Sequence, residues 1–367
     1  MTLEAPATAH RFSPDFRKFL NWALVWIVLA NIPFMAMWMV GAPPRAIPIA
    51  LAGLVGLIAK RMPRAVQWLA FAGVMIYSLL SFVSGLFSLT MDSLLYSMQF
   101  FAEIKPGNSI EYIAAAVVIV GILIGSWFLL KRDTNFAKPL HILLGGALIF
   151  GLVGADAAVG EGMRGHYFRP APAGAPFESA VKKSGFAARA DGKRHLVLII
   201  VESLGVPRDN KAMSDKLFAQ YRSSAVTDRY DVSQGTSLYY NSTTAGEMRE
   251  LCGRWGDYYE LLDSNDPATL NCLPAQLAEK GYATQAMHSF KGPFFKREDW
   301  YPKIGFQKRE FAVDLEKRGA EWCGGVFAGA CDRQVPKMLA ENLRRATRPT
   351  FQYWLTLNTH LPVPTEQ

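Results

Sequence analysis

The residues best suited to chemistry lie in the second half of the chain, in four blocks. Glu202 follows an apolar run over 196–201, and a later cluster of hydroxyls contains Thr243 and Thr244. A third block begins at His288, and a fourth contains His360. Carboxylates, hydroxyls and imidazoles are the side chains that bind metals, attack as nucleophiles and stabilise developing charge. The blocks therefore mark the region in which a site is to be sought.

Each of these residues also has an ordinary structural explanation. A hydroxyl cluster such as that at Thr243 usually caps a helix, although a helix N-terminus can also bind phosphate. Isolated histidines such as His288 and His360 are more often structural than catalytic, and Arg297 could be a plain surface charge. Glu202 could belong to a surface turn after a core strand. Only the combination of blocks favours a functional interpretation.

The elements that must position these residues follow a β-α-β rhythm. The run over 196–201 is apolar and rich in β-branched residues, which predicts a central parallel strand covered on both faces. Ligands of open α/β sheets lie beyond the carboxyl ends of strands, so Glu202 is placed where it can reach a metal. Further strands are predicted over 283–288 and 350–357, and helices over 211–223, 271–280 and 336–345. The rhythm predicts an α/β fold with a mostly parallel sheet.

The first 158 residues predict a membrane anchor. Half of the 367 residues are hydrophobic and only 19% are charged, and the apolar excess is concentrated before residue 160. Five transmembrane helices are predicted, over 21–40, 46–59, 66–87, 113–130 and 140–158, of which 46–59 is the shortest. The first is too long for a signal peptide and lacks a cleavage site. Few ionisable residues lie in the middle of these spans, which favours anchoring over solute transport.

The basic residues predict the orientation of the anchor. They cluster before the first span, around residues 60–64 and around residues 131–138, and the positive-inside rule places all three clusters in the cytoplasm. Five crossings then place the second half of the chain outside a bacterial cytoplasmic membrane, on the periplasmic or extracellular side. The outer loop 88–109 contains an amphipathic, aromatic stretch over 91–101, which lies along the membrane surface or forms an ordinary loop helix.

A proline-containing linker is predicted over 159–194, and the remaining residues, 195–367, form the soluble domain. All four cysteines lie in this domain, which suggests two disulfides in an oxidising compartment. Short loops favour the pairs Cys252–Cys272 and Cys323–Cys331, and a zinc site is the alternative, although no C-x-x-C spacing supports it. The net charge of +8 comes partly from the cytoplasmic clusters, and no basic stripe indicates nucleic-acid binding.

The four blocks resemble the sulfatase-like branch of the alkaline phosphatase superfamily. The matching stretches are the strand that ends at Glu202, then 241–253, 288–306 and 357–362, in that order behind membrane helices. Within this branch the sequence is similar to membrane-anchored lipoteichoic acid synthases, phosphoglycerol transferases and phosphoethanolamine transferases. The resemblance implies a sulfatase-like domain, here its N-terminal portion, apparently truncated at the C-terminus.

The resemblance also implies roles for individual residues. Glu202 and Thr243 correspond to ligands of a divalent metal ion (Zn, Mn or Mg), and Thr243, four residues before a glutamate, corresponds to the nucleophile that becomes phosphorylated. Thr244 is the alternative nucleophile. The residues that resemble substrate-binding positions are His288, Arg297, Trp300 and His360.

One departure from the family pattern concerns the metal. Members of the family complete the metal site with an Asp-His pair near the end of the domain, and this sequence has no Asp-His dipeptide before it ends at Gln367. We expect the sequence to be a fragment of a longer protein, the alternative being a degenerate member without activity. As written, the sequence predicts weak metal binding.

The resemblance implies an enzyme that moves the head group of a membrane phospholipid, phosphoglycerol or phosphoethanolamine, to an envelope glycan or lipid. A sulfatase or phosphodiester hydrolase is the first alternative, although no C/S-x-P-x-R motif for formylglycine is correctly placed. The second is an envelope protein that keeps the fold as a binding module without catalysis.

Overall fold

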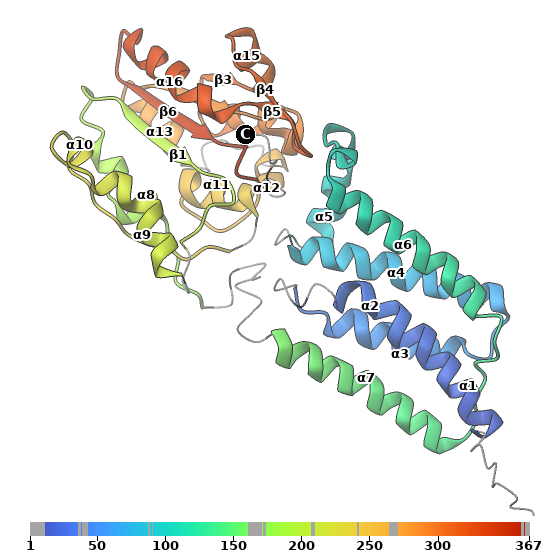
Figure 1. The fold of residues 1–367 in the computed structure, drawn as a ribbon. Helices are drawn as coiled ribbons and strands as arrows, with labels where there is room; N and C mark the ends of the chain where they lie inside the picture. Colours follow the sequence, from blue (N-terminus) through green and yellow to red (C-terminus); the bar gives the residue numbers. More distant parts are fainter. Residues whose placement is uncertain are drawn as a thin grey trace, which may run out of the picture. The chain divides into compact units, whose positions relative to one another are not determined.

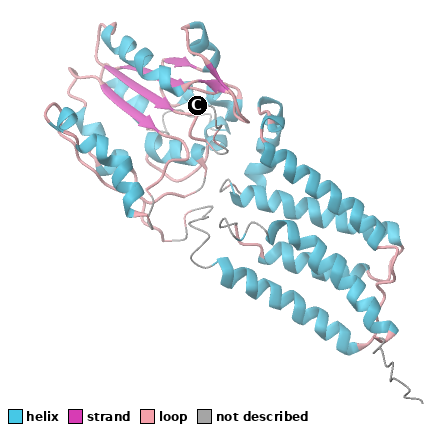
Figure 2. Cartoon of the chain, in the orientation of Figure 1, coloured by secondary structure: helices cyan, strands magenta, loops and turns pink. Residues whose placement is uncertain are grey.

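The computed structural model describes residues 12–35, 38, 43–86, 89, 91–160, 171, 174–206, 210–240, 242–263, 271–360 and 363. Its contacts divide the chain into two compact units (Figures 1 and 2). The helical unit comprises Met1–Leu94 and Glu111–Tyr167, and the sheet unit comprises Leu95–Ile110 and Phe168–Gln367. Predicted features that lie outside the described residues are positions 36, 37, 39 and 40 of the first span, position 87 of the third, 161–170 and 172–173 of the linker, and Arg11, Asn241, Leu361 and Pro362.

The helical unit is built from apolar helices joined by short connections. In chain order they are α1 (Pro14–Ala23), the π-helix η1 (Leu24–Leu29), α2 (Ala30–Met35), α3 (Ala46–Ala59), α4 (Arg64–Leu86), α6 (Ile110–Leu129) and α7 (Pro139–Gly160). The short helix α5 (Met91–Ser97) lies across the boundary, because the sheet unit begins at Leu95. The first three elements form one continuous helix, Pro14–Met35. This helix begins at Ser13, whose hydroxyl accepts the N–H of Phe16, with a proline at the first helical position.

The prediction of five spanning helices is wrong. Within the described residues, four helices are long and apolar enough to cross a membrane, namely Pro14–Met35, Arg64–Leu86, Ile110–Leu129 and Pro139–Val159. The helix predicted over 46–59 forms as α3 with 14 residues. At about 1.5 Å per residue its length is about 21 Å, which is short of the about 30 Å of a hydrocarbon core.

The short helix α3 packs closely against the first helix. A Cβ atom at Gly56 would lie 2.3 Å from Cγ of Trp26, so only glycine permits this approach. Trp22 and Trp26 are fully buried at this contact. Small residues that let backbones approach are the usual means of helix packing inside membranes.

The three basic clusters lie at one end of the helical unit. Lys18 forms an ion pair with Asp133, with a distance of 2.7 Å between Nζ and Oδ2. Lys60 Nζ, immediately after α3, donates a hydrogen bond of 2.7 Å to the carbonyl of Phe136. Because both contacts reach the connection 131–138, the chain returns to its starting end of the bundle by residue 60, and α7 starts from that same end.

The sheet unit contains a four-stranded parallel sheet in the order β1-β6-β2-β3 (Figure 2). The strands are β1 (Leu196–Ile200), β2 (Ala283–His288), β3 (Lys308–Glu310) and β6 (Thr350–Leu355). The predicted strands and parallel arrangement are therefore confirmed, but the predicted central position of β1 is wrong. Among the described strands β1 pairs with β6 alone, and the two inner strands are β2 and β6, of which β6 is buried at all six residues.

Helices cover both faces of this sheet. On one face, α11 (Thr243–Cys252), α12 (Tyr258–Asp263), α13 (Leu273–Glu279) and α14 (Arg297–Lys303) pack on alternate strand residues such as Phe351 and Tyr353. On the other, α15 (Ala312–Lys317) and α16 (Val335–Arg344) pack on Met287 and Trp354. The smaller elements are α8 (Ala180–Lys183), α9 (Lys211–Ala219), α10 (Ser224–Thr227), β4 (Trp322–Cys323) and β5 (Gly329–Ala330). The period of two along β6 thus builds two separate cores.

Both predicted disulfides form in the sheet unit. Cys252, the last residue of α11, is bonded to Cys272, which precedes α13. Cys323 of β4 is bonded to Cys331, just after β5. The pairing by short loops is confirmed, and no cysteine remains for the zinc alternative.

Candidate active site

The predicted site residues converge at the carboxyl edge of the parallel sheet. Strand pairing places Ile200, His288 and Leu355 at the same level, each at the end of its strand. Glu202 and the loop 356–360 follow directly. Because parallel strands end at one edge, segments far apart in sequence meet there, as the strand-end argument predicts.

Glu202 and Thr243 are in direct contact. Thr243 Oγ1 donates a hydrogen bond of 2.9 Å to Glu202 Oε1. The Glu202 side chain is largely buried, with 7% exposed, and burial raises the pKa of its carboxyl group. Its main-chain N–H donates to Thr356 Oγ1 at 3.0 Å, and Thr359 donates to its carbonyl at 2.5 Å. The carboxylate is thus held against a hydroxyl by groups of the neighbouring strand and loop.

The two candidate nucleophiles have different surroundings. Thr243 is the first residue of α11 and is partly exposed. Thr244 is 1% exposed and donates a 2.6 Å hydrogen bond to Asp257, and its hydroxyl lies 2.9 Å from that of Ser242. The Thr244 hydroxyl is therefore bonded within the buried interior, whereas Thr243 is partly exposed and its hydroxyl bonds to Glu202.

Two histidines flank this pair. His360 Nε2 lies 3.8 Å from Glu202 Oε1, and its ring packs on Phe327 with 4.0 Å between centroids. His288 Nδ1 lies 3.1 Å from the carbonyl of Leu355, which can only accept, so Nδ1 carries the proton and Nε2 presents a lone pair. Burial, together with the nearby positive charge of Arg297, lowers the pKa of His288 well below its usual value. His288 is therefore a neutral imidazole at neutral pH.

Arg297 and Trp300, which resemble substrate-binding positions, are buried in this structure and make hydrogen bonds inside the domain. Arg297 donates from Nε and Nη2 to Glu247 Oε2 at 3.0 and 2.8 Å. Trp300 has no exposed surface, and its indole N–H donates to the carbonyl of Phe295 at 3.1 Å. Both side chains stabilise the core behind the site.

Glu247 is a structural residue that the sequence used only as a spacing marker. Its other carboxylate oxygen, Oε1, accepts the hydroxyls of Tyr301 at 2.5 Å and Tyr353 at 2.9 Å. Thr243 and Glu247 lie four residues apart on α11 and so share one face of the helix. This buried network fixes the direction in which Thr243 points.

One family match decides the class of the soluble region. The family described as Sulfatase matches residues 194–367. Residues 194–367 are a sulfatase-family domain. A solved structure, the lipoteichoic acid synthase LtaP from Listeria monocytogenes, is similar at 18% identity, covering 48% of this chain and 43% of that one, with a TM-score of 0.34. The chain therefore spans less than half of LtaP. No curated protein matches.

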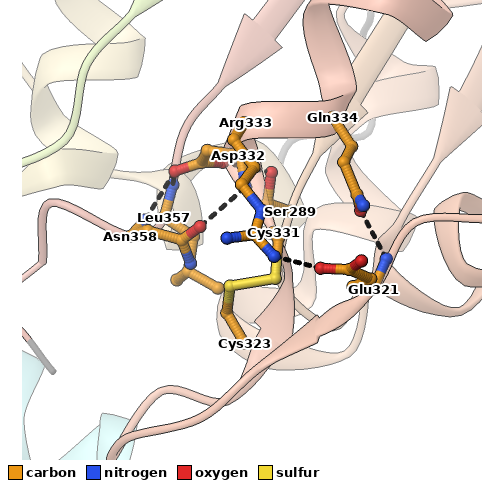
Figure 3. Close-up of a disulfide and its surroundings, with 9 residues drawn as sticks. All are labelled: Ser289, Glu321, Cys323, Cys331, Asp332, Arg333, Gln334, Leu357 and Asn358. Atoms are coloured by element: carbon orange, nitrogen blue, oxygen red, sulfur yellow. Dashed lines mark hydrogen bonds and ion pairs between the residues drawn. A yellow bond between two sulfur atoms is a disulfide. The ribbon is translucent and has the colours of Figure 1, made fainter. Parts of the chain in front are cut away.

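The loop of the sulfatase domain that carries His360 is held by a partly buried aspartate (Figure 3). Asp332 accepts the backbone N–H groups of Leu357 at 2.8 Å and Asn358 at 2.6 Å, and the hydroxyl of Ser289 at 2.5 Å. Asn358 Oδ1 accepts the N–H of Asp332 in return, at 2.6 Å. No sequence signal beyond its place after Cys331 marks Asp332, because its partners lie 25 or more residues away.

The described residues include side chains of the type that bind divalent cations, but too few of them to complete a coordination shell. Glu202 and Thr243 provide oxygen ligands of the type that such cations prefer. Within the described part of the chain, no group of three or more His, Cys, Asp or Glu residues could hold a metal ion. Sulfatase-family domains are typically metal-dependent.

Proposed function

We propose that this protein transfers a phospholipid head group, phosphoglycerol or phosphoethanolamine, to an envelope glycan or lipid through a phosphothreonine at Thr243. The observation that carries the proposal is the 2.9 Å hydrogen bond from the Thr243 hydroxyl to the buried carboxylate of Glu202. A nucleophile held against a base, at the start of a helix and at the carboxyl edge of a parallel sheet, is the arrangement needed for displacement at phosphorus.

In the first displacement, Thr243 Oγ1 attacks the phosphorus of the lipid. The bond from phosphorus to the diacylglycerol oxygen breaks, and the proton of the threonine hydroxyl passes to Glu202. The 2.9 Å hydrogen bond from Thr243 Oγ1 to Glu202 Oε1 supports this step, because it places the carboxylate where it can accept that proton. His360, whose Nε2 lies 3.8 Å from Glu202 Oε1, is placed to return a proton to the departing diacylglycerol oxygen.

In the second displacement, a hydroxyl of the acceptor attacks the phosphothreonine. The phosphorus–Oγ1 bond breaks, Thr243 recovers a proton, and the head group leaves on the acceptor. If water takes the place of the acceptor, the same residues carry out hydrolysis. The phosphodiester hydrolase is therefore the second candidate, supported by the name of the matching family.

A divalent cation, Zn, Mn or Mg, belongs to this proposal. Within the described chain its ligands would be Glu202 and Thr243. When bound, it would lower the pKa of the threonine hydroxyl and neutralise charge on the phosphoryl oxygens.

We place the sulfatase domain on the outer side of a bacterial cytoplasmic membrane. Two disulfides support an oxidising compartment. The three basic clusters gather at one end of the helical unit, which the positive-inside rule places in the cytoplasm. Because α7 starts at that end, it finishes at the outer end, and the sulfatase domain follows it.

The test uses the full-length protein in membranes, with phosphatidylglycerol or phosphatidylethanolamine labelled in the head group. We expect release of diacylglycerol and label on Thr243, identified by peptide mass spectrometry. Thr243→Ala should abolish both, and Thr243→Ser should retain part of the activity. Unchanged diacylglycerol release in Thr243→Ala would disprove the transfer mechanism. Label that appears only in water-soluble product, at every acceptor concentration, would favour the hydrolase.

A further inference from the structure

A segment between two apolar helices belongs to the sheet unit. Leu95–Ile110 lies in sequence between α4, which ends at Leu86, and α6, which begins at Ile110, and both helices are long enough to span a membrane. Its contacts nevertheless group it with the sulfatase domain rather than with the helices that precede and follow it. The segment is therefore joined to membrane helices by covalent connection and to the site-bearing unit by packing.

Aromatic side chains dock one face of the segment on the sulfatase domain. Phe100 is buried, and its ring centroid lies 5.8 Å from those of both Phe294 and Phe295. The Tyr96 ring lies 6.1 Å from that of Tyr258. These partners belong to the same block as Arg297 and to the start of α12, so the docking face lies beside the buried network behind Thr243.

Polar contacts fix the same segment close to His360. Glu103 forms a 2.8 Å ion pair with Lys291, and Lys105 N–H donates to the carbonyl of Val326 at 2.8 Å. Val326 precedes Phe327, whose ring packs on His360. Val326, the backbone contact of the segment, is therefore next in sequence to Phe327, the residue that packs on His360.

The other face of the segment exposes large apolar side chains. Leu95, Met98 and Phe101 are 49%, 53% and 62% exposed. They follow one another at intervals of three residues, so they share one side of the helical stretch formed by α5 and the 3-10 helix Met98–Glu103. Single exposed apolar residues are common, but three on one face next to two spanning helices mark a lipid or protein contact.

We propose that Leu95–Asn108 is a membrane-surface element of the sulfatase domain. Leu95, Met98 and Phe101 enter the interfacial layer of the bilayer, while Tyr96 and Phe100 hold the domain. The occupant of the apolar face is a lipid surface because the segment is tethered at both ends to helices that cross that bilayer. The role that we assign to this element, which is to present phospholipid to the site near Thr243, rests on the proposed function.

The membrane contact can be measured without any catalytic assay. All four native cysteines are in disulfides, so Met98→Cys in the full chain carries the only free thiol and can be labelled with the fluorophore NBD. In vesicles of phosphatidylglycerol and phosphatidylcholine, lipids with a spin label near the head group should quench this probe. Lys211→Cys, on exposed α9, is the matched control and should not be quenched. Equal quenching at both positions, or none at Met98→Cys and Phe101→Cys, overturns the proposal.

A second experiment connects the surface to the reaction. The double variant Met98→Asp/Phe101→Asp should release diacylglycerol about tenfold more slowly from vesicle lipid, since two apolar side chains leave the interface. With a dihexanoyl phospholipid dissolved as monomers, its rate should stay within about twofold of the unaltered protein. Gln99→Asp, exposed on the same segment, is the control for added charge. Equal loss with both donors would indicate a purely structural role and overturn the proposal.

The two proposals fail separately. If Thr243→Ala leaves head-group release unchanged while the Met98→Cys probe is quenched, the mechanism is wrong and the membrane surface stands. If the probe is not quenched while Thr243 is labelled, the membrane surface is wrong and the mechanism stands.

Discussion

Glu247 and Arg297, fifty residues apart in sequence, form a buried ion pair directly behind the candidate nucleophile. Their side chains are 0% and 2% exposed, and the glutamate also accepts two tyrosine hydroxyls. The pair joins α11, which carries Thr243, to α14 of the aromatic block. The guanidinium donates to Glu247 and to the carbonyl of Phe294, so it stabilises contacts inside the domain.

Breaking this pair should destabilise the sulfatase domain strongly. Glu247→Gln leaves the Arg297 guanidinium buried without its counter-charge, and we expect a loss of about 3–5 kcal/mol in the free energy of unfolding. Urea unfolding followed by tryptophan fluorescence measures it. The matched control is Glu260→Gln, since Glu260 forms an exposed pair with Arg254 at 3.4 Å. That variant should change the free energy by less than about 1 kcal/mol, and equal losses would contradict this reading.

Thr243 and Thr244 should separate chemistry from stability. Thr244→Val removes the hydroxyl that bonds buried Asp257 and should lower the free energy of unfolding by about 1–3 kcal/mol, while phosphate label still appears on Thr243. Thr243→Val should abolish the label with a smaller loss of stability, because its hydroxyl is partly exposed. Peptide mass spectrometry and urea unfolding of both variants check the pair. Label on Thr244 in the Thr243→Val protein would reverse the assignment.

His288 should make the domain less stable in acid. Its folded pKa lies below the unfolded value of about 6.5, so below that pH the unfolded chain binds a proton that the folded one refuses. The stability that neutral His288 provides is complete above pH about 6.5 and falls by up to about 1.4 kcal/mol per pH unit, down to the lowered folded pKa.

Comparison with His288→Asn isolates this effect. The asparagine amide can still donate to the Leu355 carbonyl but does not titrate. The difference in unfolding free energy between the two proteins, measured from pH 7.5 to pH 5 in roughly half-unit steps, should shift in favour of the variant as the pH falls. Because Glu202 is present in both proteins, its own raised pKa largely cancels. A pH-independent difference would show that the pKa of His288 is the same in the folded and unfolded protein, which contradicts this prediction.

Asp332 should act by positioning the loop that carries His360. The two carboxylate oxygens of Asp332 accept two backbone N–H groups and the hydroxyl of Ser289. Asp332→Asn replaces one of these oxygens with an NH2 group, which can only donate. We expect turnover to fall about 10- to 100-fold as the loop shifts. The control is Glu321→Gln, on an exposed pair with Arg333 in the same region, which should retain near-normal turnover (Figure 3). Normal turnover in Asp332→Asn would contradict a positioning role.

The sequence was sufficient to predict those features of the fold that depend on a local pattern of residues. Apolar runs predicted β1, β2 and β6, the strand-end argument placed Glu202 at the carboxyl edge, and the family resemblance paired Thr243 with it. Short loops gave the correct disulfides. The exposed position of Ile199 shows what pattern could not supply, since an apolar run has the same appearance in an edge strand and a central one.

The remaining differences have similar causes. The burial of Trp300 and Arg297 could not be predicted, because it depends on the packing of α14, which no single stretch of sequence encodes. Asp332 was missed because its partners come from distant segments. The helix at 46–59 was counted as a span because its composition is apolar, but its 14 residues are too few to cross the hydrocarbon core of a bilayer.

The bond between Cys323 and Cys331 has a consequence for where the protein can become active. The loop it closes contains Val326 and Phe327, one of which bonds the segment Leu95–Asn108 while the other packs on His360. Cytosolic thiols would keep both cysteines reduced, and the loop that places Phe327 against His360 would then lack its covalent link. If the domain is exported as we propose, we expect this loop to reach its final form only after oxidation on the outer side of the membrane.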